Sequence, residues 1–265
     1  MRAMTWITSY LRSGSDVAAG LVAGYLLDVP PGQTCLEALH DTAPELASLL
    51  GCGRMVPLDE RMPYAAQTYF PPDAGVLDPY AAATGKVLYL IRDPRSLVSE
   101  AVFISKAAGE QRTHLAMKLI HRIDAPGEGG KAWHAHVRDW TAADRVRARF
   151  LGLEDIRVIR FEDLRSDPAA VLRQILEFLG LPERVDDARI QRAVRDWAPE
   201  KVQGSALPEM PPGVSAFREP PPRAALPDRL PSLEDIGAEV EAAYQRRLRE
   251  NAEFAALVRR FGYES

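Results

Sequence analysis

Three short apolar segments, rich in β-branched and aromatic residues, recur along the chain at residues 4–10, 86–91 and 155–161. Each segment is followed by a turn and then by a stretch with helical periodicity. Strands that are buried on both faces of a parallel sheet form continuous apolar runs of this kind, and crossover helices connect them. The pattern therefore predicts an α/β fold with a central parallel sheet flanked by helices.

The helical pattern falls in six segments, at residues 17–27, 94–106, 133–150, 168–179, 187–197 and 233–261. Two of these helices have a well-defined start. Asp93 can accept a hydrogen bond from the first turn of a helix whose first residue is Pro94, and Asp167 with Pro168 repeats this arrangement. We expect both aspartates to be N-caps.

Two long segments lack a clean period. Residues 28–85 contain turn residues and short apolar runs, and we expect helices and loops that cover a variable substrate cleft. Residues 204–231 contain Pro220–Pro222, which exclude a regular helix or a central strand. Two interpretations of this proline-rich segment stay open, an ordered lid over a site and a surface connector. No internal repeat divides the chain, so we predict a single domain over residues 1–265.

The composition is that of a globular protein with a substantial core. The chain has 265 residues, 46% of them hydrophobic, and a formal net charge of -4 at pH 7. This balance gives no reason to expect nucleic acid or an anionic membrane as the main partner. The sequence has no signal-peptide pattern and no run of about 18 apolar residues, so we expect a cytoplasmic protein with no membrane partner. In that compartment Cys35 and Cys52 are expected to be free thiols.

Residues 4–15 are the most informative part of the chain. The apolar strand stops at Arg12 and the small residues 13–15, and an Ala- and Leu-rich helix follows. A helix N-terminus offers unpaired N–H groups and the positive end of the helix dipole to an anion. The segment therefore predicts a phosphate-binding strand, loop and helix, although Asp16 adds a negative charge at the turn.

Further segments share a family pattern. Residues 86–95 read Lys-Val-Leu-Tyr-Leu-Ile-Arg-Asp-Pro-Arg, and residues 158–164 read Val-Ile-Arg-Phe-Glu-Asp-Leu. With the N-terminal loop and the segments 136–140 and 175–180, they resemble the cytosolic-type sulfotransferases over most of residues 4–182. The size of the chain is nearest to the bacterial members that modify glycopeptide antibiotics.

This resemblance implies a fold and an activity. The fold is the P-loop-like sulfotransferase fold. The enzymes pass a sulfuryl group from 3′-phosphoadenosine-5′-phosphosulfate to a hydroxyl or amine, and here the acceptor is expected to be a small specialised metabolite, as in antibiotic biosynthesis. The resemblance also places Arg12, Ser13, Gly14 and Ser15 in the loop that binds the phosphosulfate, and makes Arg92 the arginine that binds the 3′-phosphate.

Other positions depart from the family pattern and predict a degenerate donor site. The serine found eight residues after the arginine aligns with Glu100, and Ser99 is one position short. Arg218 is the remnant of a late Arg-Lys-Gly loop that also contacts the phosphate. Asp16 replaces a hydroxyl of the loop, and Val17 replaces the tryptophan on which adenine stacks.

The catalytic residues implied in the same way are Arg12, Tyr69 and Asp16. The family's base is a histidine at the end of the second strand, and here Gln67-Thr68-Tyr69 aligns with that segment. A tyrosine, with an ordinary pKa near 10, is a poor base at neutral pH unless a neighbouring cation lowers that pKa. The other interpretation is that Tyr69 is an aromatic packing residue beside Phe70.

No metal is expected at this site, because the leaving group is already a stable phosphate. His134 and His136, two residues apart on a predicted helix, project to different faces and are better explained as surface or structural residues. Gly127–Lys131 has the composition of a phosphate loop, but no strand precedes it, and we expect a flexible loop.

Three classes of function stay open. The chain is a working sulfotransferase with a divergent donor site, or a related enzyme reused for chemistry on a natural-product intermediate without this sulfuryl donor, or an inactive binding partner. In the second case Asp16, Tyr69 and Glu100 would line the old donor cleft as acid, base or substrate-orienting groups. Neither the acceptor nor the oligomeric state can be read from these patterns.

Overall fold

The computed structural model describes residues 3–28, 42–60, 62–124, 131–181, 185–196 and 230–264. The chain divides into two compact units. The first unit comprises residues 1–91 and 140–223, and the second comprises residues 92–139 and 224–265. The single domain expected for the whole chain stays a prediction.

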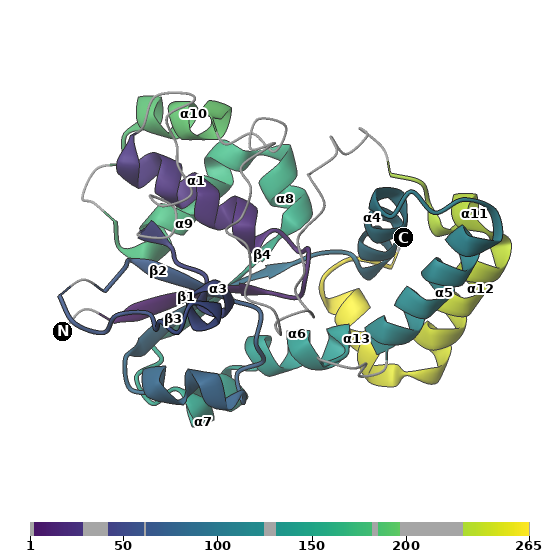
Figure 1. Ribbon diagram of the computed structural model, residues 1–265, viewed down its shortest axis with the longest axis horizontal. Coiled ribbons are helices and arrows are strands. Elements are labelled where there is room, and N and C mark those ends of the chain that lie inside the picture. The colour runs from purple at the N-terminus through teal and green to yellow at the C-terminus, as the bar shows by residue number, and fades with distance from the viewer. Residues whose placement is uncertain are drawn as a thin grey trace. The chain divides into compact units, whose positions relative to one another are not determined.

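A four-stranded parallel sheet forms the centre of the first unit (Figure 1). Its strands are β1 (Met4–Ser9), β2 (Ala65–Thr68), β3 (Thr84–Ile91) and β4 (Asp155–Arg160). The strand order is β2-β1-β3-β4, so β1 and β3 are the central strands. This arrangement confirms the predicted α/β class and the three strands expected from the apolar segments. β2 was expected only as the second strand of the family pattern, and it ends one residue before Tyr69.

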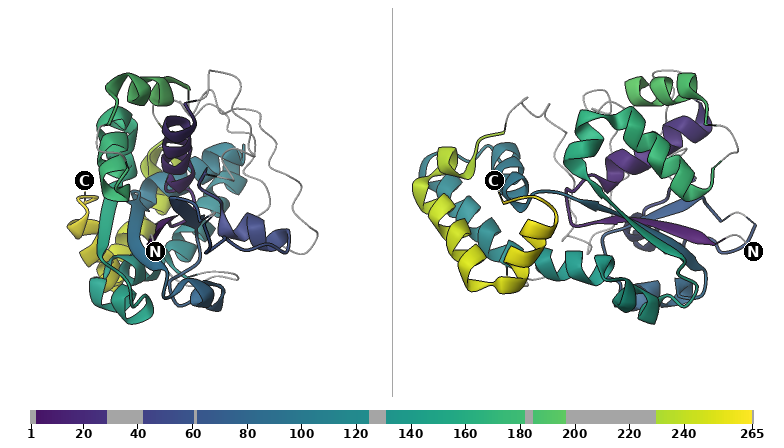
Figure 2. Two further views of the ribbon diagram at one scale, coloured as in Figure 1. Left: turned by 90° about the vertical axis from the view of Figure 1, so that its left-hand side faces the viewer. Right: turned by 180° about the vertical axis from the view of Figure 1, so that it is seen from behind.

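Helices cover both faces of this sheet (Figures 1 and 2). One face carries α1 (Ser15–Leu27), α8 (Phe161–Ser166), α9 (Pro168–Leu179) and α10 (Asp187–Asp196). The other face carries the 3-10 helix η1 (Gly75–Tyr80) and α7 (Ala143–Arg149), and α3 (Leu46–Gly51) packs beside β2. The central strands are therefore buried on both faces, which explains their continuous apolar sequence.

Side chains from β1 anchor the core on both sides of the sheet, because successive residues of a strand point to opposite faces. On the α1 face Ile7 packs in an aliphatic cluster with Leu88 of β3 and with residues of α1 and α9. On the opposite face the ring of Trp6 meets Tyr80 edge-on, with centroids 5.2 Å apart, and its indole N–H donates to the Thr84 hydroxyl at 3.0 Å. All six residues of β1 are buried, so the carboxyl end of this strand is held firmly.

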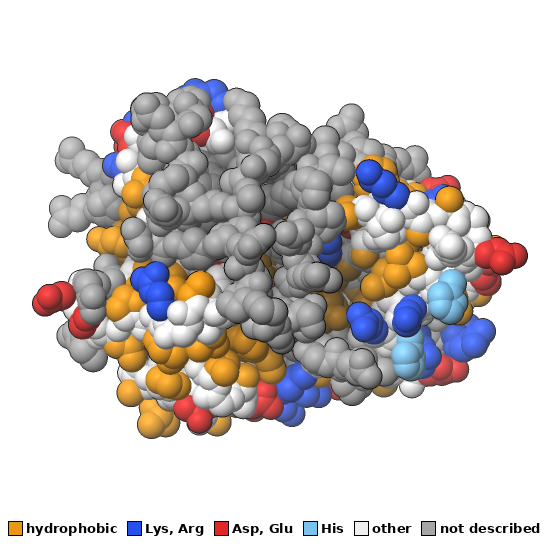
Figure 3. All heavy atoms as spheres, in the orientation of Figure 1, with side chains coloured by type: hydrophobic (Ala, Val, Ile, Leu, Met, Phe, Trp, Pro, Cys, Tyr) orange, Lys and Arg blue, Asp and Glu red, His pale blue; other side chains and the backbone are white. Residues whose placement is uncertain are grey.

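The described part of the second unit is helical. It contains α4 (Pro94–Ile104), α5 (Gly109–Asp124), α11 (Leu233–Ile236), α12 (Ala238–Glu250) and α13 (Ala252–Arg260), and α6 (Trp133–Thr141) begins in it. Phe254 lies in its core, where its ring meets Trp133 and Tyr244 edge-on at centroid distances of 5.6 and 5.7 Å. On the face shown in Figure 3, the basic side chains of this unit gather over α5 and α12. No described helix has both the length and the apolar character needed to cross a membrane.

Both predicted N-caps are confirmed. The Asp93 carboxylate accepts a hydrogen bond from the N–H of Arg95 at 2.8 Å, and a proline is the first residue of α4. The Asp167 carboxylate accepts from the N–H of Ala170 at 3.0 Å at the start of α9, where a proline again follows. Each cap satisfies a backbone donor that the helix itself cannot pair.

Two predicted long helices are wrong, since each is broken. Residues 133–150 form α6 and α7, separated at Ala142, whose backbone is extended (φ −86°, ψ 105°). Residues 233–261 form α11, α12 and α13, separated at Gly237 and at Asn251. Asn251 is extended as well, and its side chain caps α13. At Asn251 the apolar stripe resumes in nearly the same phase, so helical periodicity does not reveal that break. At Ala142 the phase shifts, since Val146 lies about 120° around a continuous helix from Trp140.

Candidate functional site

The loop between β1 and α1 has the geometry of an oxyanion-binding helix start. Ser13 donates its N–H to the carbonyl of Tyr10 at 3.0 Å, which closes a tight turn directly after β1. Arg12 and Gly14 have positive φ angles of 64° and 95°, and Ser15 then begins α1. The first-turn N–H groups of a helix have no carbonyl partner within that helix, and they carry the positive end of its dipole.

Gly14 ties this loop to the first residue of α8. A Cβ atom at position 14 would lie 2.3 Å from Cδ2 and 2.8 Å from Cε2 of the Phe161 ring. Its φ of 95° is also a backbone conformation that residues with a Cβ rarely adopt. The close approach and the positive φ both require glycine here.

Two buried hydroxyl groups in and just before the loop have no hydrogen-bond partner within the described part of the chain. They belong to Ser13 and Thr8, which are both 0% exposed. A buried hydroxyl left unpaired costs about 1–3 kcal/mol, so native proteins usually supply a partner from the chain, water or a ligand. The Ser13 hydroxyl, which lies in the loop, is therefore suited to pairing with an oxyanion at the start of α1.

Tyr69 joins the same loop. It directly follows β2, which is the parallel neighbour of β1, and its hydroxyl is hydrogen-bonded to the Ser15 side chain. Ser9 Oγ in turn donates to Ser15 Oγ at 2.9 Å. Three hydroxyl groups thus connect the ends of β1 and β2 with the start of α1. Tyr69 is more than an aromatic packing residue beside Phe70.

Tyr69 is protonated at neutral pH. Burial of its hydroxyl, together with the negative charge of Glu45, raises the pKa of Tyr69 to about 12, and the hydrogen bond with Ser15 offsets only part of this. The charged neighbour of the phenol is thus an anion, which raises its pKa. A tyrosine that acts as a base near pH 7 would need a neighbouring cation to lower that pKa. Tyr69 can donate a hydrogen bond to a bound oxyanion, but a role as base near pH 7 does not fit.

Glu45 is the site residue that the sequence analysis missed. It directly precedes α3, forms an isolated parallel bridge with Gln67 of β2, and its carboxylate accepts from the Ser48 hydroxyl at 2.6 Å. Its place near Tyr69 depends on α3 packing beside β2. No spacing or local pattern in the sequence could have indicated that.

The remaining loop residues take different positions. Arg12 is partly exposed in the loop, and Asp16 is exposed on the first turn of α1. An acidic residue in the first turn is favourable toward the helix dipole, and solvent screens its charge when it is exposed. The conflict that Asp16 poses for an anion at this loop is thereby reduced. Val17 packs against the aliphatic core cluster, so it helps to hold α1 on the sheet.

Arg92 follows β3 and opens the second unit, where it forms a buried ion pair. Its Nη1 pairs with Oε2 of Glu100 on α4. The Arg92 side chain is 3% exposed and that of Glu100 is 9% exposed. The residue eight positions after the arginine therefore does face it, as the family alignment implies, but that residue is a carboxylate. Ser99 is buried on α4 about 100° around the helix from Glu100.

Arg95, the second arginine of this segment, also has partners. Its guanidinium forms an ion pair with Asp93, with Nη2 to Oδ2 at 3.1 Å, and donates to the carbonyl of Tyr263 at 3.0 Å. It also lies over the ring of Tyr244, 6.0 Å from the centroid. These contacts hold the start of α4 against the C-terminal helices of the same unit.

Other predicted features do not add to the site. Arg218 and most of the proline-rich segment lie outside the described residues, as do Cys35 and the expected loop at residues 127–130. Among the described residues, no three His, Cys, Asp or Glu side chains group as metal ligands would. His136 is 3% exposed, and His134 Nε2 lies 3.8 Å from a carboxylate oxygen of Glu253.

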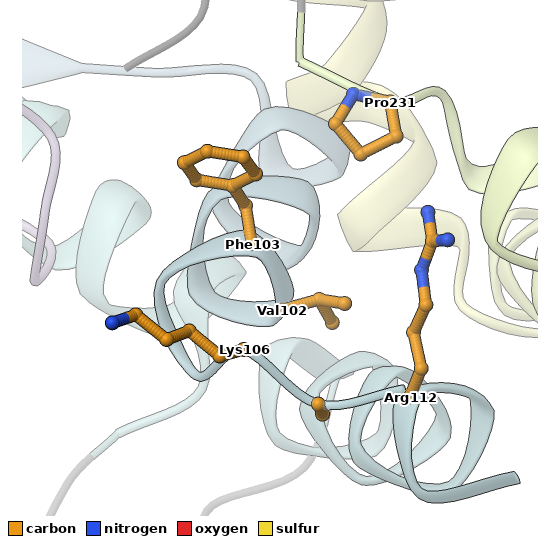
Figure 4. A pocket seen from close by; sticks show the side chains of 6 residues that line it. Val102, Phe103, Lys106, Arg112 and Pro231 are labelled. Atoms are coloured by element: carbon orange, nitrogen blue, oxygen red, sulfur yellow. The ribbon is translucent and has the colours of Figure 1, made fainter. Parts of the chain in front are cut away.

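A shallow hollow in the second unit contains none of the predicted site residues. It is lined by Val102, Phe103, Lys106, Ala107, Arg112 and Pro231. Figure 4 shows that the side chains of Lys106 and Arg112 extend in different directions, so the two cations do not converge on one anion. The chemistry expected from the sequence lies at the β1–α1 loop and at the start of α4.

Comparisons with known proteins agree on one family. Residues 84–187 match the family model described as sulfotransferase family. Mouse Sulfotransferase 2B1 (Mus musculus) is 24% identical over 178 residues, which is 67% of this chain and 50% of that protein. A 3-beta-hydroxysteroid sulfotransferase of Cavia porcellus is 30% identical over 111 residues, which is 40% of this chain and 36% of that protein. The chain thus spans half or less of the length of these curated relatives.

Solved structures show the same fold. The structure of mouse sulfotransferase SULT7A1 complexed with PAP has a TM-score of 0.62 at 15% identity, covering 99% of this chain and 89% of that one. Retinol dehydratase in complex with androsterone and inactive cofactor PAP has a TM-score of 0.55 at 18% identity, covering 94% and 81%. At these identities the likeness concerns the fold, and it confirms the fold predicted from the sequence.

Proposed function

We propose that this chain, whose matched segment and fold support membership of the sulfotransferase family, transfers a sulfuryl group from a 3′-phosphoadenosine-5′-phosphosulfate type of donor. The acceptor would be a hydroxyl or amine of a small specialised metabolite, as in antibiotic biosynthesis, and the reaction would take place in the cytoplasm. The acceptor class and the location rest on the resemblance of the sequence alone. The two structural neighbours hold PAP, and one of them also holds androsterone.

The observation that carries the proposal is the fit of the β1–α1 loop to a phosphosulfate. The loop combines the N-terminus of a 13-residue helix, the buried unpaired hydroxyl of Ser13 and the cation of Arg12. An oxyanion there would pair with the Ser13 hydroxyl, which has no partner among the described residues, and with the helix start. Gly14 is required for this geometry, because a Cβ would meet the Phe161 ring.

Each loop residue has a role in such a transfer. When bound, the donor supplies an activated sulfuryl group whose leaving group is a phosphate. The start of α1 and the Ser13 hydroxyl would orient the 5′ end, and Arg12 would stabilise charge on the leaving oxygen. Tyr69, which is held protonated, would donate a hydrogen bond to the same oxyanion. The acceptor proton needs another base, since Tyr69 cannot take it near pH 7.

Titration calorimetry with adenosine 3′,5′-bisphosphate, the desulfated product of the donor, tests the proposal. We expect wild-type protein to bind it in the micromolar range and Arg12→Ala to weaken binding by about 10- to 100-fold, the value of one charge-assisted hydrogen bond. Arg147→Ala is the matched control, because Arg147 is exposed on α7 of the same unit. Equal affinity of wild type and Arg12→Ala would show that the loop does not hold the ligand.

A second candidate is enzyme chemistry that does not use this donor. The observation that favours it is the ion pair of Arg92 with the Glu100 carboxylate. Arg92 is the residue expected to bind the 3′-phosphate of the donor, and the carboxylate occupies it. Incubation with the sulfated donor and a panel of small hydroxyl and amine compounds, analysed by mass spectrometry, separates the two. Sulfated products support the first function. If wild-type protein does not bind adenosine 3′,5′-bisphosphate in the calorimetric titration, that result supports the second.

A further inference from the structure

Arg92 and Glu100 form the most deeply buried ion pair among the described residues of the second unit. Arg92 is the first residue of this unit and Glu100 lies on α4, so the pair links two residues eight positions apart within the unit. Their side chains are 3% and 9% exposed. Because both side chains are buried, the pair is far less screened by solvent than a surface ion pair.

The pair is unfavourable for binding a phosphate at Arg92. A phosphate that approached the guanidinium would meet the like charge of the Glu100 carboxylate, which is already in contact with it. Displacing that carboxylate would leave a buried anion without its partner, which is strongly destabilising. Arg95 does not offer a substitute, because it is engaged with Asp93 and the Tyr263 carbonyl.

A ribose 3′-hydroxyl carries none of these penalties. It is uncharged, and it can donate a hydrogen bond to a carboxylate as well as accept one from a guanidinium. The chemistry at Arg92 and Glu100 thus fits a nucleotide that ends in a 3′-hydroxyl and disfavours one that ends in a 3′-phosphate. The part of the 3′-phosphorylated donor that would reach Arg92 does not fit these residues.

We propose that Glu100 acts as an internal competitor for the 3′-phosphate, so that this chain accepts adenosine 5′-phosphosulfate with a free 3′-hydroxyl as its donor class. This inference rests on the proposed function and changes its donor. In the transfer, the acceptor oxygen or nitrogen bonds to sulfur, and the bond from sulfur to the 5′-phosphate oxygen breaks with its electron pair on that oxygen. Adenosine 5′-monophosphate leaves, and the acceptor proton passes to solvent.

The test compares two nucleotides on intact protein by titration calorimetry. Adenosine 5′-monophosphate and adenosine 3′,5′-bisphosphate differ only in the 3′-phosphate. We expect wild type to bind them with dissociation constants within about threefold of each other, because the 3′-phosphate gains no net charge-assisted bond. In Glu100→Gln, which keeps the shape and removes the charge, the bisphosphate should bind about tenfold more tightly, while the monophosphate changes little.

Glu253→Gln is the matched control, since Glu253 lies in the same unit with a side chain that is 42% exposed and pairs with Arg138. It should leave both affinities unchanged. A wild-type preference of about thirtyfold or more for the bisphosphate would overturn the inference and leave the proposed function standing, since it would equal a full charge-assisted contact. If wild type binds neither nucleotide, the proposed function fails, and the inference fails with it. The wild-type ratio decides the question even if Glu100→Gln does not fold.

Discussion

Gly14→Ala is the substitution to which the β1–α1 loop should be most sensitive. The new Cβ would lie 2.3 Å from Cδ2 of Phe161, so the ring or the loop must move. The φ of 95° adds the cost of a left-handed conformation for a residue with a Cβ. Backbone strain of about 1–2 kcal/mol and overpacking of about 1–3 kcal/mol together predict a loss of about 2–5 kcal/mol in the free energy of unfolding.

Urea denaturation followed by circular dichroism measures this loss, and the chain supplies a matched control. Gly53 also has a positive φ, 67°, but a Cβ there would have no neighbour within 4 Å. Gly53→Ala should therefore report the backbone cost alone, about 1 kcal/mol. The difference between the two variants isolates the contact with the Phe161 ring.

A double-mutant cycle with Phe161→Leu makes the test sharper. The smaller side chain should relieve part of the clash, so Gly14→Ala should cost at least about 1 kcal/mol less in that background. If Gly14→Ala costs no more than Gly53→Ala and shows no coupling to Phe161, the close packing of loop and α8 is refuted.

Two further predictions concern ionisation. Burial of the Tyr69 hydroxyl, and to a lesser extent the negative charge of Glu45, raises the folded-state pKa of Tyr69 to about 12, above the ordinary value of about 10. Stability due to Tyr69 is therefore complete below about pH 10 and is lost as pH rises from there toward 12. In urea titrations, the difference in the free energy of unfolding between wild type and Tyr69→Phe should be constant below about pH 10 and should change only in that window. Burial raises the pKa of Asp139, but the hydrogen bonds and the positive charges of Arg138 and Lys131 together hold that pKa below its ordinary value, 3.8. Asp139→Asn should lower the free energy of unfolding by about 3 kcal/mol at pH 7, and by less as the pH falls below 3.8. The control substitution Asp144→Asn, at an exposed position, should change it little. Equal costs of Asp139→Asn at pH 7 and pH 3 would contradict this reasoning.

The parts of the fold that could be predicted are those in which local sequence and burial agree. The apolar runs of β1 and β3 identify the sheet because these central strands are buried on both faces, whereas β4 is an edge strand and only partly buried. The N-caps Asp93 and Asp167 were predictable because a cap is a contact between residues that are close in sequence. The β1–α1 loop was predictable for the same reason.

Other elements were missed for identifiable reasons. The helix α5 carries a usable signal, because its residues Leu115, Ala116, Leu119 and Ile120 recur at helical spacing. The predicted helices nevertheless did not include this segment. The break at Asn251 leaves the apolar period intact, so it could not be read from that period. The break at Ala142 does carry a signal, because the apolar stripe changes phase between Trp140 and Val146.

The candidate site shows the limit of sequence reasoning more clearly. Alignment with the family placed Glu100 opposite Arg92, yet it could not show that the two form a buried pair. The effect of Glu45 on Tyr69 and the contact of Gly14 with Phe161 join segments far apart in the chain. Long-range contacts of this kind decide the chemistry of the site, and no local pattern encodes them.

Amide hydrogen exchange tests the central claim, that the start of α1 binds the 5′ end of a nucleotide, most directly. First-turn amides lack a carbonyl partner within the helix, so a bound phosphate should slow their exchange. With adenosine 3′,5′-bisphosphate or adenosine 5′-monophosphate at a concentration near the wild-type dissociation constant, the account predicts slower exchange in peptides that cover residues 10–18, and little slowing in Arg12→Ala at the same concentration. Unchanged exchange in those peptides, with protection elsewhere in the chain, would contradict it.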